Sequence, residues 1–230
     1  MAQVKSIHKH AFWLYGVIVG LAIKAALEGA VPHIIAPPNA PLEFVPDLAR
    51  LIVFLTLIVR FYLGSAIYFG DVYEGDTADI DYKEKNYALD FLFGFMHFLA
   101  FFLLAFAIDI HSKPAILFPG ILAFILFYDF IWWGFCRKYD ASGMIAVWMA
   151  VNLISLLCGA LVYFISRSVG SNEVRAELYA FVPIMIFSII DLADMVLEKP
   201  IYENVLAKFK RRQSTPALPP APPTDLPPAT

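Results

Sequence analysis

Six apolar segments, each close to twenty residues long, dominate this sequence. They cover residues 11–31, 48–70, 87–110, 115–136, 144–166 and 177–197. A helix rises 1.5 Å per residue, so about twenty residues cross the roughly 30 Å of hydrocarbon in a bilayer. The segments are continuously apolar, whereas barrel strands alternate in polarity. We therefore predict an all-α fold, a polytopic transmembrane bundle of about six helices that forms one domain over residues 1–199.

The composition argues against an ordinary soluble domain. Hydrophobic residues make up 60% of the 230 residues and charged residues 16%. Soluble domains carry about 45–50% apolar and about 25% charged residues. The lipid bilayer is therefore the partner that we expect. The formal net charge is only -3 and no broad basic face is evident, so no nucleic-acid partner is expected.

The first apolar segment has two interpretations. A basic start followed by the apolar residues 11–23 also fits a secretory signal peptide. Lys24 and Glu28, however, occupy the region where a small-residue cleavage site would be expected. We therefore predict that this segment is retained as the first helix.

Two connecting segments stand out between the predicted helices. Residues 32–46 contain five prolines, which predict an extended loop. Residues 71–84 are strongly acidic and are expected to form a second loop.

Lysine and arginine residues outside the predicted spans or close to their ends are unevenly distributed, which predicts the orientation. The cytoplasmic side is the one with the excess of such residues. One side has Lys5, Lys9, Lys83, Lys85, Arg137, Lys138, Lys199, Lys208, Lys210, Arg211 and Arg212, and the other has Arg50, Lys113, Arg167 and Arg175. With six spans, both termini are then expected in the cytoplasm, and the membrane is expected to be an inner or plasma membrane.

The C-terminal region divides into two predicted parts. In residues 200–212, Ile201, Val205 and Phe209 recur every four residues. The neighbouring Lys208, Lys210, Arg211 and Arg212 predict a basic amphipathic segment on anionic lipid headgroups. An equally good interpretation is a plain positive stop after the last span. Residues 213–230 are rich in proline and are predicted to be disordered.

Charged residues within the spans are the main evidence about function, because a charge in lipid is costly and usually faces the bundle interior or water. Lys24 and Glu28 lie one turn apart, which predicts a local ion pair. Arg60 lies near the middle of the second span, where it requires an anionic partner, carbonyl groups or water. Both an interhelical packing pair and an anion or gating site fit Arg60.

Six further polar residues are candidates for a transport or ion-binding site. When successive spans alternate in direction, most of them fall in the cytoplasmic half of the bilayer, and His97 lies near its middle. We expect a partly hydrated acidic vestibule below Arg60, in which His97 could carry protons because its ordinary pKa is near 6.5. The alternative is that most of these groups only stabilise helix packing or face water at the headgroups. The candidates are Asp90, His97, Asp129, Asn152, Asp191 and Asp194.

These observations leave two main hypotheses for the function. The first is a small transporter or channel for an ion, a proton or a solute. The second is a signalling or assembly component that does not transport, acts through its cytoplasmic segments, and forms a homo-oligomer or binds another membrane protein. A lipid-modifying enzyme is a weaker hypothesis, because no nucleotide loop, nucleophile elbow or metal-binding spacing occurs in the sequence. We predict no cofactor and no metal.

Overall fold

The computed structural model describes residues 2–35, 44–74, 80–109, 114, 116–136 and 144–197. Side chains are described from residue 13 onward, except at a few helix ends. The described residues form six helices and no strand. The helices are α1 (Ala2–Ile35), α2 (Val45–Glu74), α3 (Ile80–Phe106), α4 (Leu117–Cys136), α5 (Met144–Ser168) and α6 (Glu173–Leu197). The predicted all-α class is confirmed, whereas residues 198–230, with the predicted basic segment and tail, lie outside the described residues.

The two predicted loops are shorter than expected, because helices extend into both of them. Pro32 lies inside the last turn of α1, where a proline removes only one helical hydrogen bond. Pro46 is the second residue of α2, a position where its missing N–H has no helical partner to lose. In the acidic segment, α2 continues to Glu74 and α3 begins at Ile80. The expected loops at 32–46 and 71–84 are therefore wrong at their edges.

The connection between α5 and α6 is fixed by local hydrogen bonds. Gly170 adopts a φ of 90°, which glycine reaches without a steric penalty. The amides of Gly170 and Ser171 donate to the carbonyls of Arg167 and Ser166, which closes the end of α5 as a Schellman motif. Asn172 then caps α6, since its side-chain oxygen accepts a hydrogen bond of 2.9 Å from an amide of the first turn. This turn brings α5 and α6 together as an antiparallel pair.

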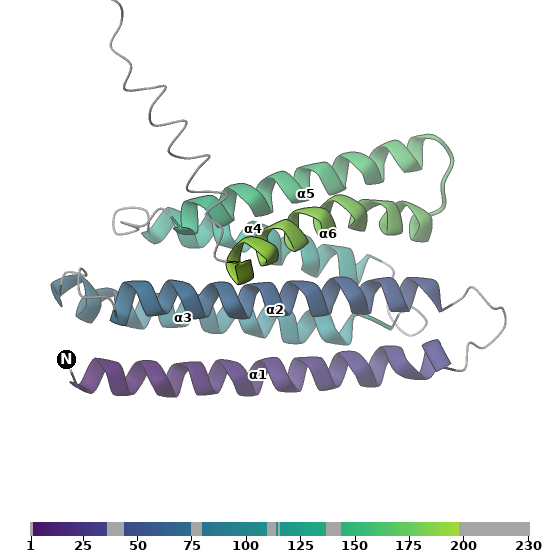
Figure 1. The fold of residues 1–230 in the computed structure, drawn as a ribbon. Helices are drawn as coiled ribbons and strands as arrows, with labels where there is room; N and C mark the ends of the chain where they lie inside the picture. The colour runs from purple at the N-terminus through teal and green to yellow at the C-terminus, as the bar shows by residue number, and fades with distance from the viewer. Residues whose placement is uncertain are drawn as a thin grey trace, which may run out of the picture.

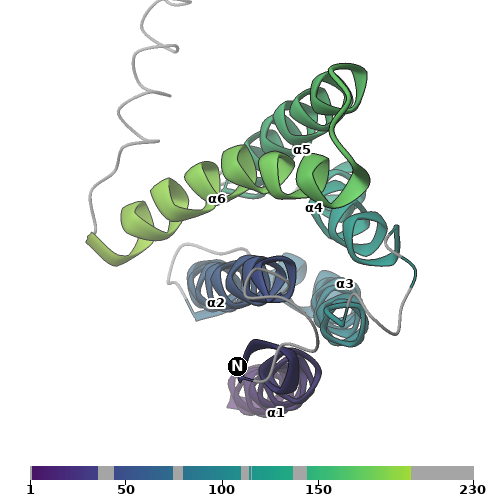
Figure 2. The same cartoon turned by 90° about the vertical axis from the view of Figure 1, so that its right-hand side faces the viewer.

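The helices form three layers in the end-on view (Figure 2). Helices α2 and α3 make the middle layer. Helix α1 lies alone on one side, packed against both of them, and α4, α5 and α6 lie on the other side. Successive helices run in opposite directions, so the start of α1 and the end of α6 lie toward the same end of the bundle (Figure 1).

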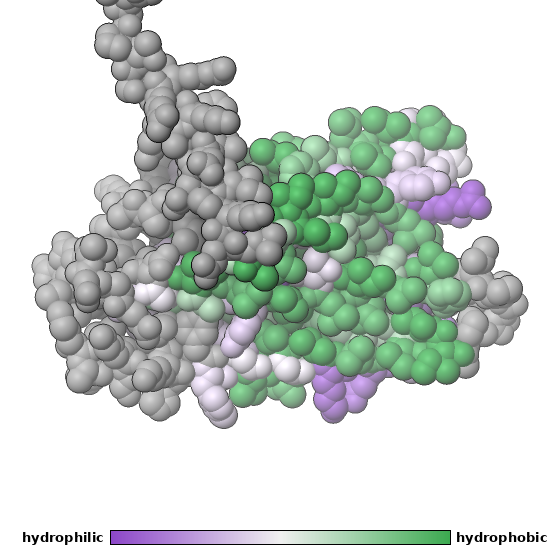
Figure 3. Space-filling view, viewed as in Figure 1, coloured by the Kyte–Doolittle hydropathy of each residue, from purple (hydrophilic) through white to green (hydrophobic). Residues whose placement is uncertain are grey.

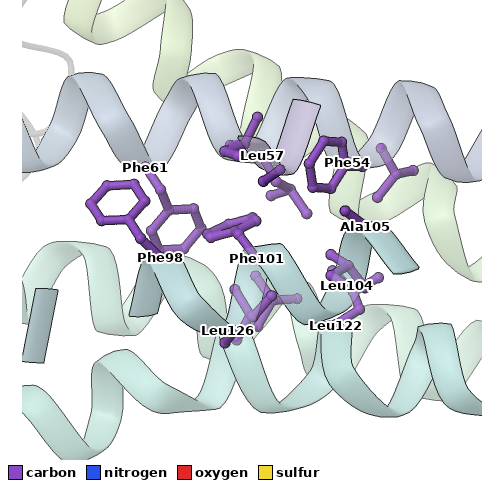
Figure 4. Packing of buried hydrophobic residues seen from close by; sticks show 14 of the residues in the cluster. Phe54, Leu57, Phe61, Phe98, Phe101, Leu104, Ala105, Leu122 and Leu126 are labelled. Carbon is purple, nitrogen blue, oxygen red and sulfur yellow. The ribbon is translucent and has the colours of Figure 1, made fainter. Parts of the chain in front are cut away.

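The core is built from large apolar side chains between the layers. Figure 4 shows aromatic and leucine side chains from α2, α3 and α4 meeting in its centre, among them Phe54, Phe101 and Leu126. Hydrophobic residues also cover most of the described outer surface in Figure 3. All six helices contain a segment long and apolar enough to span a membrane, from Trp13–Ile35 in α1 to Glu173–Val196 in α6. The fold is therefore compatible with an integral membrane protein that crosses the bilayer several times.

Candidate functional site

A continuous chain of polar side chains runs through the middle of the bundle, and five of the six helices each contribute one member. The members are buried, with between 0% and 4% of each residue exposed. We call this chain the central network, and it consists of His97 from α3, Asp129 from α4, Asn152 from α5, Arg60 from α2 and Asp191 from α6.

The order of contacts in the central network follows from the donors and acceptors available. Arg60 forms an ion pair with Asp191 through Nε, and its Nη1 donates a hydrogen bond of 2.6 Å to the side-chain oxygen of Asn152. The amide nitrogen of Asn152 donates to Oδ2 of Asp129. Asp129 Oδ1 lies 3.4 Å from Nδ1 of His97. Asn152 thus connects a charged pair at one end to a titratable pair at the other.

His97 is enclosed by aromatic rings. Its ring centroid lies 4.5 Å from that of Phe61, 5.7 Å from Phe101 and 5.2 Å from Tyr128. Its second nitrogen, Nε2, is buried and has no hydrogen-bond partner among the described residues. A buried polar atom without a partner is costly and requires a reason. At this end the central network therefore stops at a buried imidazole nitrogen whose hydrogen-bonding capacity is not used by the described residues.

The space next to Arg60 is small. A cavity of about 10 Å³ lies between Arg60, Asp191 and Trp148. This is close to the minimum that a single water molecule needs. Gly64, one turn from Arg60, is required here because an added Cβ would lie 2.8 Å from Trp148 Cζ2. The side chains beside Arg60 are therefore closely packed, and the hydrated vestibule stays a prediction.

Asp90 lies in a separate cluster, although it is on the same face of α3 as His97. Tyr68 and Tyr73 donate hydrogen bonds to its Oδ2, and Trp132 Nε1 donates to its Oδ1 at 3.3 Å. The separation of seven positions between Asp90 and His97 corresponds to about 10 Å along the helix axis. We call this group the Asp90 cluster, and it lies toward the end of the bundle where α2 and α4 finish.

A third buried cluster lies at the opposite end of the bundle, and the sequence analysis did not predict it. Arg50 was expected outside the membrane as a topology signal, but it is fully buried. It pairs with both carboxylate oxygens of Glu177, at 2.8 Å and 2.7 Å. Its Nη1 also lies 3.4 Å from the carbonyl oxygens of Ala107 and Ile108, and the ring of Phe118 lies 5.2 Å from the guanidinium carbon. Glu177 is the first residue of the predicted sixth span, whereas α6 begins four residues earlier, at Glu173. The prediction therefore set Glu177 at a helix end and missed its pairing with Arg50.

The remaining candidates are not among the five members of the central network. Lys24 and Glu28 form the predicted ion pair at 3.3 Å, and both are exposed. Asp194 is half-buried on the turn of α6 that follows Asp191. Lys208, Lys210, Arg211 and Arg212 lie outside the described residues. Within the described part of the chain, no group of three or more His, Cys, Asp or Glu side chains is placed to hold a metal ion.

No family model, curated protein or solved structure matches this chain. The function must therefore be argued from the three buried polar clusters themselves.

Proposed function

We propose that the protein translocates protons across the membrane, with the central network as its proton-binding site. The observation that carries this proposal is the charge balance of the network. It contains one guanidinium, two carboxylates and one imidazole, all nearly or fully buried. With both carboxylates ionised and His97 neutral, the formal charge is -1. A single proton on the His97–Asp129 pair makes the network neutral, which is the favourable condition in a low-dielectric interior.

Close packing favours a proton over a larger substrate. A hydrated ion or an organic solute requires a passage, and the cavity beside Arg60 measures only about 10 Å³. A proton can instead pass between hydrogen-bonded side chains and single water molecules. Chains of Asp, Glu and His residues inside the membrane are typical of such relays.

Each member of the central network has a distinct role in this proposal. His97 and Asp129 exchange the proton, since they are the titratable pair in contact. Arg60 compensates the charge of Asp191, and Asn152 holds Arg60 and Asp129 at a fixed separation. Asp90 lies about two turns along α3 from His97 and is the next carboxylate on the proposed route toward that end of the bundle.

The positive-inside count places both termini in the cytoplasm of an inner or plasma membrane in this proposal. The Asp90 cluster then lies toward the cytoplasm and the Arg50–Glu177 pair toward the opposite side. Lys208, Lys210, Arg211 and Arg212 would bind anionic headgroups on the cytoplasmic face.

The proposal is tested by proton flux into liposomes that contain the purified protein and a trapped pH indicator. A pH gradient is imposed, and the membrane potential is clamped with a potassium ionophore. Wild-type protein should acidify the lumen faster than empty liposomes, and Asp129→Asn should reduce the rate to that background. Ser188→Ala is the matched control, because it also removes a buried polar group, but its hydroxyl donates to the backbone carbonyl of Ile184 and belongs to neither the central network nor the Asp90 cluster. Equal rates for wild-type protein and empty liposomes would refute the proposal.

A second candidate function is that of a membrane assembly or signalling component without transport. The observation that favours it is that both buried arginines tie α2 to α6, as two interhelical packing pairs would. This hypothesis expects a stable complex with another membrane protein and no flux. Asp129→Asn would then leave that complex unchanged.

A further inference from the structure

A layer of three residues covers the central network on one side. Gly64 on α2, Trp148 on α5 and Met195 on α6 each lie four positions along the chain from the network member of their own helix. Four positions correspond to one turn, about 6 Å along the helix axis. Helix α5 runs opposite to α2 and α6 (Figure 1), and Trp148 precedes its network member whereas the other two follow theirs. All three are therefore displaced toward the end of the bundle where α2 and α4 finish, and we call them the Trp148 layer.

The indole ring of Trp148 fills this layer. An added Cβ at Gly64 would lie 2.8 Å from Trp148 Cζ2 and 3.3 Å from Met195 Cε, so both side chains pack directly on the glycine. All three residues also line the cavity of about 10 Å³ beside Arg60. That volume is close to the minimum for a single water molecule. As the described side chains are packed, a chain of water molecules does not fit through the Trp148 layer.

The other side of Trp148 faces the Asp90 cluster. Tyr68 lies a further turn along α2 from Gly64. Its ring centroid lies 6.4 Å from that of Trp148, and its hydroxyl donates a hydrogen bond of 3.2 Å to Asp90. The indole ring therefore contacts both the cavity beside Arg60 and a member of the Asp90 cluster. It lies between the two groups that the proposed proton route connects.

We propose that Trp148 is a gate that controls the passage of water, and with it protons, between the central network and the Asp90 cluster. An apolar constriction stops conduction because a chain of water molecules cannot form through it. The indole offers a donor but no acceptor, so the ring blocks the route without carrying the proton itself. Trp148 is only half-buried, so a turn of its ring toward the surface opens the layer without displacing the buried Arg60. The gate rests on the proposed function, in which Asp90 is the next carboxylate on the route.

Access of water to Arg60 tests the gate without any measurement of flux. Trp148→Ala removes a ring much larger than a water molecule, whose share of the liquid is about 30 Å³. The Nε–H groups of Arg60 and Arg50 both donate to carboxylates of α6, so they provide a comparison within one molecule. In Trp148→Ala, the Nε–H of Arg60 should exchange with deuterated water about tenfold faster, whereas that of Arg50 should keep its wild-type rate. Nuclear magnetic resonance of protein labelled with ¹⁵N-arginine measures both rates.

Two further variants separate gating from a general loosening of the bundle. Trp133→Ala is the matched control, because Trp133 is likewise a partly buried tryptophan packed against the core, and it should change neither exchange rate. Trp148→Phe keeps a ring over Gly64 and should stay within about twofold of wild type at both arginines. Equal acceleration at Arg60 and Arg50, or no acceleration at Arg60 in Trp148→Ala, would overturn the gate.

The liposome assay then tests whether the gate limits proton flux. Trp148→Ala should acidify the lumen about tenfold faster than wild type, because water then connects the central network to the Asp90 cluster. Adding Asp129→Asn to this variant should return the rate to background, since the protons still pass through the central network. A rate for Trp148→Ala at the wild-type level would overturn the gate. No flux from wild-type protein would refute the proposed function, whereas the exchange rates of Arg60 and Arg50 would still confirm or overturn the closure of the cavity by Trp148.

Discussion

The two buried arginines of α2 form similar ion pairs with α6, but the surroundings of the two pairs differ. Arg50 and Arg60 each pair with a carboxylate of α6, Glu177 and Asp191 respectively. The Arg50 pair is closed, because both carboxylate oxygens are used and the remaining contacts go to two backbone carbonyls and an aromatic ring. The Arg60 pair is open, because Asn152 extends it to a titratable Asp–His pair.

This difference separates a role in packing from a role in function. The two formal charges of the Arg50–Glu177 pair cancel, although the carboxylate of Asp47 is also buried at this end of the bundle. With both carboxylates ionised and His97 neutral, the central network has a formal charge of -1, and it ends on an imidazole nitrogen that has no hydrogen-bond partner in the described part of the chain. We propose that the Arg50–Glu177 pair holds α2, α3 and α6 together and that the central network exchanges protons.

The largest expected effect is on stability, at the closed pair. Arg50→Met should lower the free energy of unfolding by about 3–5 kcal/mol, because it leaves the carboxylate of Glu177 buried without a compensating charge. Arg50→Met combined with Glu177→Met should recover most of that loss and keep proton flux. Both effects are measured by denaturant unfolding of the purified protein in detergent. A double variant as unstable as the single one would show that the pair contributes more than charge compensation.

The corresponding double variant in the central network should behave differently. Arg60→Met with Asp191→Met also removes both charges, but it leaves the side-chain oxygen of Asn152 without its donor. We expect a residual loss of about 1–3 kcal/mol in the free energy of unfolding and proton flux at background. Full recovery of both properties would erase the distinction between the two pairs.

Two glycines of α2 provide a matched test of packing beside the central network. Gly64→Ala should lower the free energy of unfolding by about 1–3 kcal/mol, because the added methyl group would overlap Trp148. Gly70→Ala meets nothing within 4 Å and should raise it by about 0.5–1 kcal/mol through helix propensity alone. Thermal unfolding of both variants measures these changes in the free energy of unfolding. Equal changes for the two variants would mean that Trp148 moves aside at little cost.

The smallest effect is expected at the Asp90 cluster. Tyr73→Phe removes one donor to Asp90 and should cost about 1 kcal/mol of unfolding free energy. The donors Tyr68 and Trp132 remain, so proton flux should stay within about twofold of wild type. A loss of flux comparable to that of Asp129→Asn would place Tyr73 on the proton route itself.

The sequence predicted the helices and named all five members of the central network as candidates, because both depend on local patterns. Long apolar segments predict spans, and a charge such as Arg60 in the middle of one must find a partner inside the bundle. Alternating spans then brought Asp129, Asn152 and Asp191 to a common depth near Arg60. The five residues in contact were all among the predicted candidates.

The features that escaped prediction depend on tertiary contacts. Arg50 lies near the first residue of its apolar segment, where a charged side chain is usually expected to face water outside the membrane. Only the packing of α6 against α2 shows that Arg50 is buried. Asp90 and His97 share a helix face, but their separation along the axis assigns them to different clusters. The exposure of Lys24 and Glu28 likewise depends on which side of α1 faces α2 and α3.

Protonation of the central network is the claim on which this account depends most, and infrared difference spectroscopy measures it directly. The purified protein in lipid is titrated with acid, and the carboxylic acid and imidazole bands are recorded. Wild-type protein should show one protonation change that disappears when Asp129→Asn and His97→Gln are combined, and that persists in the Arg50→Met and Glu177→Met double variant. A titration that is identical in all three proteins would contradict the account.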